Sequence, residues 1–147
     1  MSCEVLWSQY QLLHTTYEGF NDQSLILKGW SVTIGLAAIV TAYSDAVGSR
    51  GRVVVLAAAF SATVFWLVDA FWKSYQLAYK KLLEISEASW DCSGVLNKGP
   101  SIQADWPQVY SSFDFFSVLH FPSVALPHGF VVALGVCLAW KFPPKSN

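Results

Sequence analysis

Long apolar segments alternate with short polar ones along the chain, and two of the apolar segments are clear. Residues 25–43, "LILKGWSVTIGLAAIVTAY", and residues 53–72, "VVVLAAAFSATVFWLVDAFW", each approach 20 mostly apolar positions. That is the length an α-helix needs to cross the hydrocarbon core of a bilayer, where lipid offers the backbone no hydrogen-bond partner. The polar, glycine-containing "SDAVGSRGR" lies between them. We therefore predict spans over 25–44 and 53–72, joined as a helical hairpin.

A third span is less regular. The apolar run at 128–140 is too short alone, but extending it back through "FPSVALP" gives a span over 121–141. Pro122 suits the first helical turn, and Pro127 would kink the helix. Residues 107–120 mix aromatic and polar side chains, which predicts a helix lying along the headgroups, with a re-entrant segment as the alternative. Residues 89–106 read as a loop.

Apolar residues at alternating spacings of four and three continue beyond the hairpin. They predict an amphipathic helix over 1–24 and an extension of the second span, without a break, to about residue 88. The two sets are Leu6, Tyr10, Leu13, Tyr17 and Phe20, and then Phe71, Tyr75, Ala78, Leu82 and Ile85. Both emerge on the same side of the membrane, where they can form a stalk. Packing within one subunit and packing between subunits both remain open.

Composition supports a membrane protein. Of the 147 residues, 54% are hydrophobic and 13% are charged, whereas soluble domains carry about 25% charged residues. We therefore predict a single all-α integral membrane domain that forms an oligomeric bundle. The net charge of −1 gives no overall basic signal for nucleic acid or acidic lipid. The widely spaced cysteines form no Cys/His cluster, and we expect neither a metal nor another cofactor.

Orientation depends on a small difference in basic residues. Five lysines lie on the stalk side and four basic residues on the hairpin side: Lys28, Lys73, Lys80, Lys81 and Lys98 against Arg50, Arg52, Lys141 and Lys145. This difference of one basic residue gives only weak support for an orientation under the positive-inside rule. Cys3 and Cys92, taken as free thiols, suit a reducing compartment. We therefore expect the N-terminus and stalk in the cytoplasm and the spans in the inner (cell) membrane.

Lys28 and Asp69 are the two charged residues inside the first two spans. In a hairpin, residues at equal depth have numbers that add to a constant, which is 97 if Ser44 lies opposite Val53, and Lys28 and Asp69 satisfy it. A lone charge at mid-bilayer costs about 2.5–3.5 kcal/mol, less toward the ends, and pairing offsets part of this. The pair is thus a structural ion pair, or either residue forms a ring of charge at the mouth of an oligomeric pore. The two interpretations are compatible if the ion pair breaks when a gate opens.

Small residues recur at every fourth position of each span, which favours close approach of helix backbones. The first span carries two such rows, Gly29, Thr33, Ala37 and Thr41, and then Ser31 and Gly35; the second pairs Ala57 with Ser61, Ala58 with Ala62 and Ala59 with Thr63; the third has Gly129, Ala133 and Cys137. Three spans are too few to enclose a path. Any transport role therefore requires several chains, with Thr33 and Thr41 as candidate pore or gate residues beside Lys28 and Asp69.

Catalysis receives little support. His120, His128 and Asp114 could form a His/Asp pair, with Ser123 as the obvious nucleophile. No G-x-S-x-G, H-E-x-x-H or glycine-rich phosphate loop surrounds them. We expect that the protein is not an enzyme, and that both histidines are interfacial residues bonded to backbone or headgroups. A role in gating stays open.

Two sequence elements point to a family. "LKGWSVT" opens the first span, and "FWLVDAFW" closes the second before a charged helix with "YKKL". Over about residues 20–85 the chain resembles small bacterial three-span membrane proteins of antiphage defence systems, such as the Hailong-type channel effector. The third span departs from their pattern. The resemblance implies a homo-oligomeric ion channel in the lipid bilayer, controlled by a nucleotide or oligonucleotide from a partner nucleotidyltransferase.

An anionic signal of this kind requires cations and stacking surfaces on the stalk side. The candidate ligand-binding residues are Lys73, Tyr79, Lys80, Lys81, Trp90 and Lys98. The alternative is a solvated helix face on which Glu84 and Glu87 balance the lysines. The sequence thus predicts an ion channel or pore-forming effector. Its rivals are a non-conducting anchor or regulatory subunit and, more remotely, a lipid-modifying enzyme.

Overall fold

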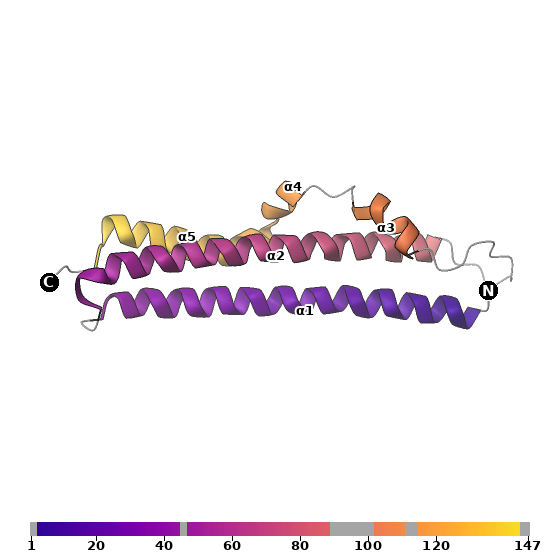
Figure 1. Ribbon diagram of the computed structural model, residues 1–147, viewed down its shortest axis with the longest axis horizontal. Coiled ribbons are helices and arrows are strands. Elements are labelled where there is room, and N and C mark those ends of the chain that lie inside the picture. Colours follow the sequence, from indigo (N-terminus) through magenta and orange to yellow (C-terminus); the bar gives the residue numbers. More distant parts are fainter. Residues whose placement is uncertain (1–2, 45–46, 89–101, 111–114, 145–147) are drawn as a thin grey trace.

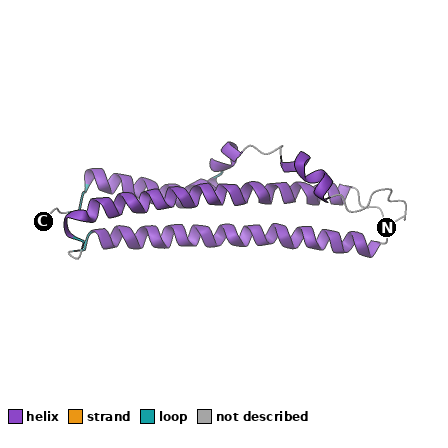
Figure 2. Ribbon diagram, viewed as in Figure 1, coloured by secondary structure: helices purple, strands orange, loops and turns teal. Residues whose placement is uncertain are grey.

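Two long antiparallel helices form the body of the protein in the computed structural model, which describes residues 3–44, 47–88, 102–110 and 115–144 (Figure 1). Helix α1 covers Cys3–Ala42, and helix α2 covers Gly51–Ala88 after the short 3-10 turn η1, Gly48–Arg50. Helix α5, Pro122–Lys141, lies along the hairpin half of α2. Helices α3, Ile102–Tyr110, and α4, Phe115–Leu119, pack against the rest of α2, and the described residues contain no strand (Figure 2).

The helix bounds refine the sequence-based segments. Residues 3–42 form one helix, so the amphipathic segment and the first span are not separate elements. Helix α3 begins at Ile102, inside the stretch 89–106 that was expected to be a loop; residues 89–101 of that stretch lie outside the described residues. The interfacial helix expected over 107–120 corresponds to the end of α3 and to α4, with residues 111–114 also outside the described part.

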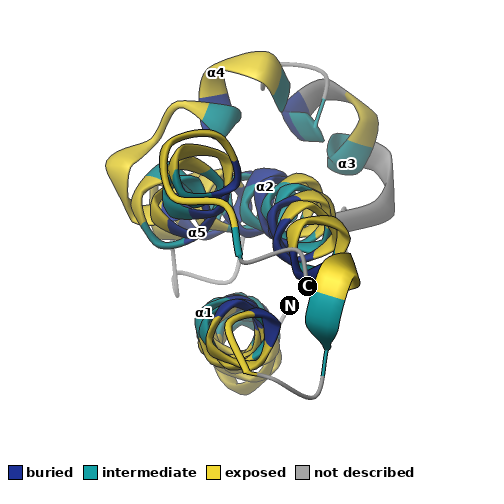
Figure 3. Ribbon diagram, turned by 90° about the vertical axis from the view of Figure 1, so that its left-hand side faces the viewer, coloured by how far each residue is buried: buried dark blue, intermediate teal, exposed yellow. Residues whose placement is uncertain are grey.

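Three helices are long and apolar enough to cross a membrane, namely α1, α2 together with η1, and α5. At 1.5 Å per residue, α2 is about 57 Å long, nearly twice the roughly 30 Å of hydrocarbon. The outer faces of the bundle are exposed, and large apolar side chains such as Val40, Phe60 and Leu126 lie on them (Figure 3). The chain thus has the architecture of a multi-pass membrane protein whose first two helices extend beyond the bilayer.

Small residues allow close helix packing in the hairpin half. A Cβ placed on Gly35 would lie 2.5 Å from Cγ1 of Val131, and one on Gly135 would lie 3.1 Å from Cβ of Ala59. Helix α5 therefore approaches α1 at Gly35 and α2 at Gly135. Not every predicted row packs in this way: the row that starts at Gly29 on α1 is exposed, as are Ala133 and Cys137 on α5. Within the chain, α5 packs through Gly135, whereas Cys137 is exposed.

The stalk is held together within one chain. Leu13 of α1 packs with Ala78, Leu82 and Leu83 of α2 and with Val109 of α3. Aromatic rings surround this cluster, with Trp106 stacked on Tyr75 and Tyr110, and Tyr79 beside Trp106 and Phe20. The apolar face of the second helix is shorter than the set of residues predicted from the sequence, because Phe71 and Ile85, at its two ends, are exposed.

Cys3 corrects one premise of the orientation argument. It is disulfide-bonded, so it is not a free thiol. Disulfides persist in oxidising compartments and are rare in the cytosol. The cysteines therefore no longer favour a cytoplasmic stalk, and the orientation is left to the near-even distribution of basic residues.

Candidate functional site

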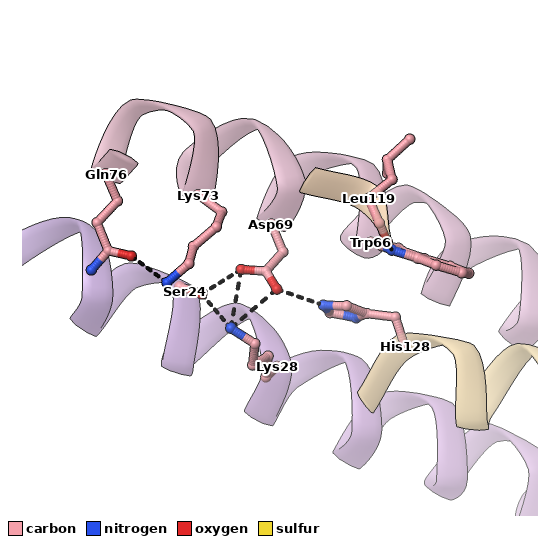
Figure 4. A network of polar contacts seen from close by, with 8 residues as sticks. All are labelled: Ser24, Lys28, Trp66, Asp69, Lys73, Gln76, Leu119 and His128. Carbon is pink, nitrogen blue, oxygen red and sulfur yellow. Dashed lines mark hydrogen bonds and ion pairs between the residues drawn. The ribbon is translucent and has the colours of Figure 1, made fainter. Parts of the chain in front are cut away.

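Asp69 lies at the centre of a polar network between the spans (Figure 4). It is fully buried on α2, and its Oδ2 lies 3.1 Å from Nζ of Lys28 on α1. Oδ1 lies 3.3 Å from the same Nζ. The structure thus brings together the two charges that helix register placed at one depth. The Lys28 side chain keeps 17% of its surface exposed, so only the carboxylate is completely withdrawn from solvent.

Ser24 adds a second donor from α1. Its hydroxyl donates to Oδ1 of Asp69 over 2.5 Å and accepts a hydrogen bond from Nζ of Lys28, one helical turn further along. A buried carboxylate is tolerated only when its oxygens receive hydrogen bonds. Ser24 and Lys28 supply these from adjacent turns of one helix, which fixes the rotation of α1 relative to α2.

His128 brings the third span into the network. It is fully buried on α5, and its Nε2 lies 3.2 Å from Oδ2 of Asp69. The prediction that it is bonded to the backbone or to headgroups is therefore wrong, because its partner is a side-chain carboxylate. His120 does match that description, because it is exposed and its Nδ1 lies 2.8 Å from the carbonyl oxygen of Phe116. One available signal was chemical: a carboxylate accepts several hydrogen bonds, and His128 is one of the side chains of the third span able to provide another.

The polar row continues toward the stalk. Lys73, one turn beyond Asp69, donates to Oε1 of Gln76 over 2.6 Å. The buried Gln76 in turn reaches the carbonyl oxygen of Tyr17 on α1 at 3.5 Å. Polar side chains thus line the contact between α1 and α2 from the stalk to Asp69. His128 lies at the opposite end of this row from Gln76 (Figure 4).

The depth of the network follows from helix length. Asp69 is 18 residues from Gly51, which corresponds to about 27 Å along the helix. If the hairpin end lies at one surface of the hydrocarbon, Asp69 lies close to the opposite surface. Trp66, one turn deeper, donates from Nε1 to the carbonyl oxygen of Leu119 over 3.0 Å. Its ring therefore anchors the segment between α4 and α5.

The other candidate residues are dispersed. Thr33 and Thr41 are exposed on the outer face of α1, and Thr41 donates to the carbonyl oxygen of Ala37. Lys80 and Lys81 are exposed on the stalk, where Lys81 pairs with Glu84 at 3.4 Å. Tyr79 belongs to the aromatic cluster beside Trp106. Trp90 and Lys98 lie outside the described residues, as does Asp114.

The chemistry of the network follows from its charges. One carboxylate faces the ammonium group of Lys28 and an imidazole, so its charge is already balanced. No group of three or more metal-ligating side chains occurs in the described part of the chain. Ser123, the candidate nucleophile, is exposed, whereas His128 is buried. The network can therefore hold the three spans together.

Comparison with known proteins gives no match: no protein-family model, no curated protein and no solved structure is similar to the chain.

Proposed function

We propose that the protein is the subunit of a homo-oligomeric membrane ion channel, opened by an anionic, nucleotide-type signal during antiphage defence. The observation that carries this proposal is the burial of Asp69 with Lys28 and His128, one residue from each span. Ionisable residues inside membrane spans are costly, and they characteristically mark ion or proton pathways and gates. A change at this one point acts on all three helices at once.

Assembly through α1 supports the oligomer. Three spans cannot enclose a path, and α1 presents an exposed row of small and hydroxyl-bearing residues to its surroundings: Gly29, Thr33, Ala37 and Thr41. Nothing lies within 4 Å of a Cβ placed on Gly29, so the helix of another copy can approach closely there. In the proposed oligomer Thr33 and Thr41 face the neighbouring subunit or the path.

The proposed signal binds the stalk. Lys80 and Lys81 are exposed there, and phosphate groups bind such ammonium groups. The sequence elements shared with antiphage channel effectors suggest a nucleotide made by a partner nucleotidyltransferase. This part of the proposal requires the stalk to be cytoplasmic, and the disulfide at Cys3 is the observation that opposes it.

Impermeant maleimide labelling of Lys81→Cys in intact bacteria tests this orientation. The background for this variant carries serine at positions 3, 92 and 137. The proposal predicts labelling only after permeabilisation. Labelling of intact cells would place the stalk outside and eliminate a cytoplasmic signal, while leaving the channel itself to be tested.

Reconstitution tests the channel. The purified chain should form an oligomer of defined mass and release ions from liposomes. Lys28→Ala and Asp69→Ala should each change assembly or flux, and the charge-swapped double variant should partly recover it. A swap no better than the worse single variant would show that the two residues do not act as a unit.

A second candidate function is a non-conducting anchor for a larger complex. It is favoured by the completeness of the Asp69 contacts within one chain, because a charge satisfied in this way needs no pore. A monomer that gives no ion flux in the same reconstitution would support the anchor and contradict the channel.

A further inference from the structure

Two buried polar atoms lie beside the charge network without a hydrogen-bond partner in the described part of the chain. They are Oγ of Ser31 on α1 and Nδ1 of His128 on α5. Both residues are almost completely buried, with 1% and 0% of their surface exposed. Leaving such atoms unpaired costs free energy comparable to a lost hydrogen bond, so buried polar groups of this kind characteristically bind an ordered water or a ligand.

These two atoms belong to the same layer of the bundle. Helices α1 and α5 run in the same direction and meet where Gly35 faces Val131 (Figure 1). Ser31 and His128 each precede this contact by one helical turn. Because both residues are buried, they face the interior between α1, α2 and α5. The layer therefore contains an imidazole nitrogen and a hydroxyl, a pair of groups that a water molecule can join.

The charges around this layer favour a water and a proton over a metal ion. Lys28 of α1 already neutralises Asp69 of α2, and Lys73, also of α2, adds a second positive charge one turn away. A metal cation would meet net repulsion there, as would an imidazolium until Lys28 withdraws its ammonium group. Since a carboxylate only accepts hydrogen bonds, the Nε2 that faces Asp69 carries a hydrogen. Nδ1 of the neutral ring is then a free acceptor, able to take up one proton.

Access to the layer differs between the two ends of the bundle. Toward the stalk, Lys73, Gln76 and the partly exposed Lys28 provide a polar route. Toward the hairpin, Gly35 against Val131 and Gly135 against Ala59 close the interface with apolar contacts. The polar contacts of this layer therefore lie toward the stalk, and its apolar contacts lie toward the hairpin.

We propose that a water molecule held by Ser31 and His128 passes a proton from the stalk side to Nδ1 of His128, which then replaces Lys28 as the cation paired with Asp69. The proton comes from solvent and the ring becomes an imidazolium with a hydrogen on both nitrogens. Asp69 cannot balance two buried cations. Lys28, which is already partly exposed, swings its ammonium group toward the membrane surface, and α1 loses its ionic contact with α2.

Solid-state NMR of the full chain in lipid bilayers, labelled with ¹⁵N in histidine and lysine and ¹³C in aspartate and glutamate, tests this exchange. At pH 8 we expect His128 to carry a hydrogen on Nε2 alone and to show water contact at Nδ1. At pH 5 the proposal predicts a hydrogen on both ring nitrogens. The dipolar coupling between Lys28 Nζ and Asp69 Cγ should fall several-fold, while that between His128 Nε2 and Asp69 Cγ persists.

Variants assign the signals. His14→Gln and His120→Gln combined leave His128 as the one histidine without altering the network, so folding at Asp69 is preserved. The exposed pair of Lys81 and Glu84 provides the matched control and should be unchanged between the two pH values. A His128 ring with an unchanged protonation state, or an unchanged coupling between Lys28 and Asp69, would overturn the proposal. The experiment measures protonation and not conductance, so such a result leaves the proposed channel to its own test.

Discussion

The two halves of the bundle are held together by different physical means. In the hairpin half, glycine and alanine let α5 approach α1 and α2, and the contacts are apolar. In the stalk half, Asp69, Ser24, Lys73 and Gln76 form a polar row between α1 and α2, bordered by aromatic rings. Close packing of small residues holds the hairpin half together, and hydrogen bonds and an ion pair hold the stalk half together. The second half is therefore the part whose contacts depend on charge.

Asp69→Ala should have the largest effect. It leaves Lys28 and His128 without their shared partner, and breaking a buried ion pair costs about 3–5 kcal/mol. Unfolding by a denaturing detergent should show this loss. Glu84→Ala, which removes the carboxylate of the exposed stalk pair, should cost no more than about 1 kcal/mol. Equal losses for the two variants would show that Asp69 is not in a buried network.

Gly35→Ala tests the hairpin half. The new Cβ would lie 2.5 Å from Cγ1 of Val131, and overpacking of this kind costs about 1–3 kcal/mol. Adding Val131→Ala should restore stability, as measured by the same unfolding assay. Gly19→Ala is the matched control: nothing lies within 4 Å of its Cβ, and the change should be neutral or stabilising by up to about 1 kcal/mol. A loss at Gly19 equal to that at Gly35 would contradict the packing described for α1 and α5.

Trp66→Phe should have the smallest effect. It removes the bond from Nε1 to the carbonyl oxygen of Leu119 and keeps most of the ring packing. The expected loss is about 1 kcal/mol. Hydrogen exchange should increase at the start of α5 while the contact between α1 and α2 stays protected. Increased exchange along the whole bundle would show that Trp66 supports more than this segment.

The hairpin and its ion pair could be predicted from the sequence because both are local consequences of helix geometry. A tight turn fixes the register of α1 and α2, so Lys28 and Asp69 could be matched by number alone. No comparable constraint fixes α5. More than 30 residues separate α2 from α5, and the depth and rotation of α5 depend on the contacts of Gly35 and Gly135 with Val131 and Ala59. For this reason the contact of His128 with Asp69 and the packing at Gly135 could not be predicted.

The pairing of small residues was predicted only in part for the same reason. Ser31 and Ala62 are buried, whereas Thr33 and Ala133 belong to rows that look equivalent in the sequence but face outward. A spacing of four residues identifies a helix face that permits close approach. Which face is used depends on the neighbouring helices.

A double-mutant cycle on Lys28 and Asp69 tests the central claim most directly. Lys28→Ala, Asp69→Ala and the double variant are unfolded in the same detergent titration. Because both side chains belong to one network inside one chain, we expect a coupling energy of about 1–3 kcal/mol, with the double variant little worse than Asp69→Ala alone. If the losses of stability of the two single variants add up to that of the double variant within about 0.5 kcal/mol, the two residues do not interact, which would contradict the account.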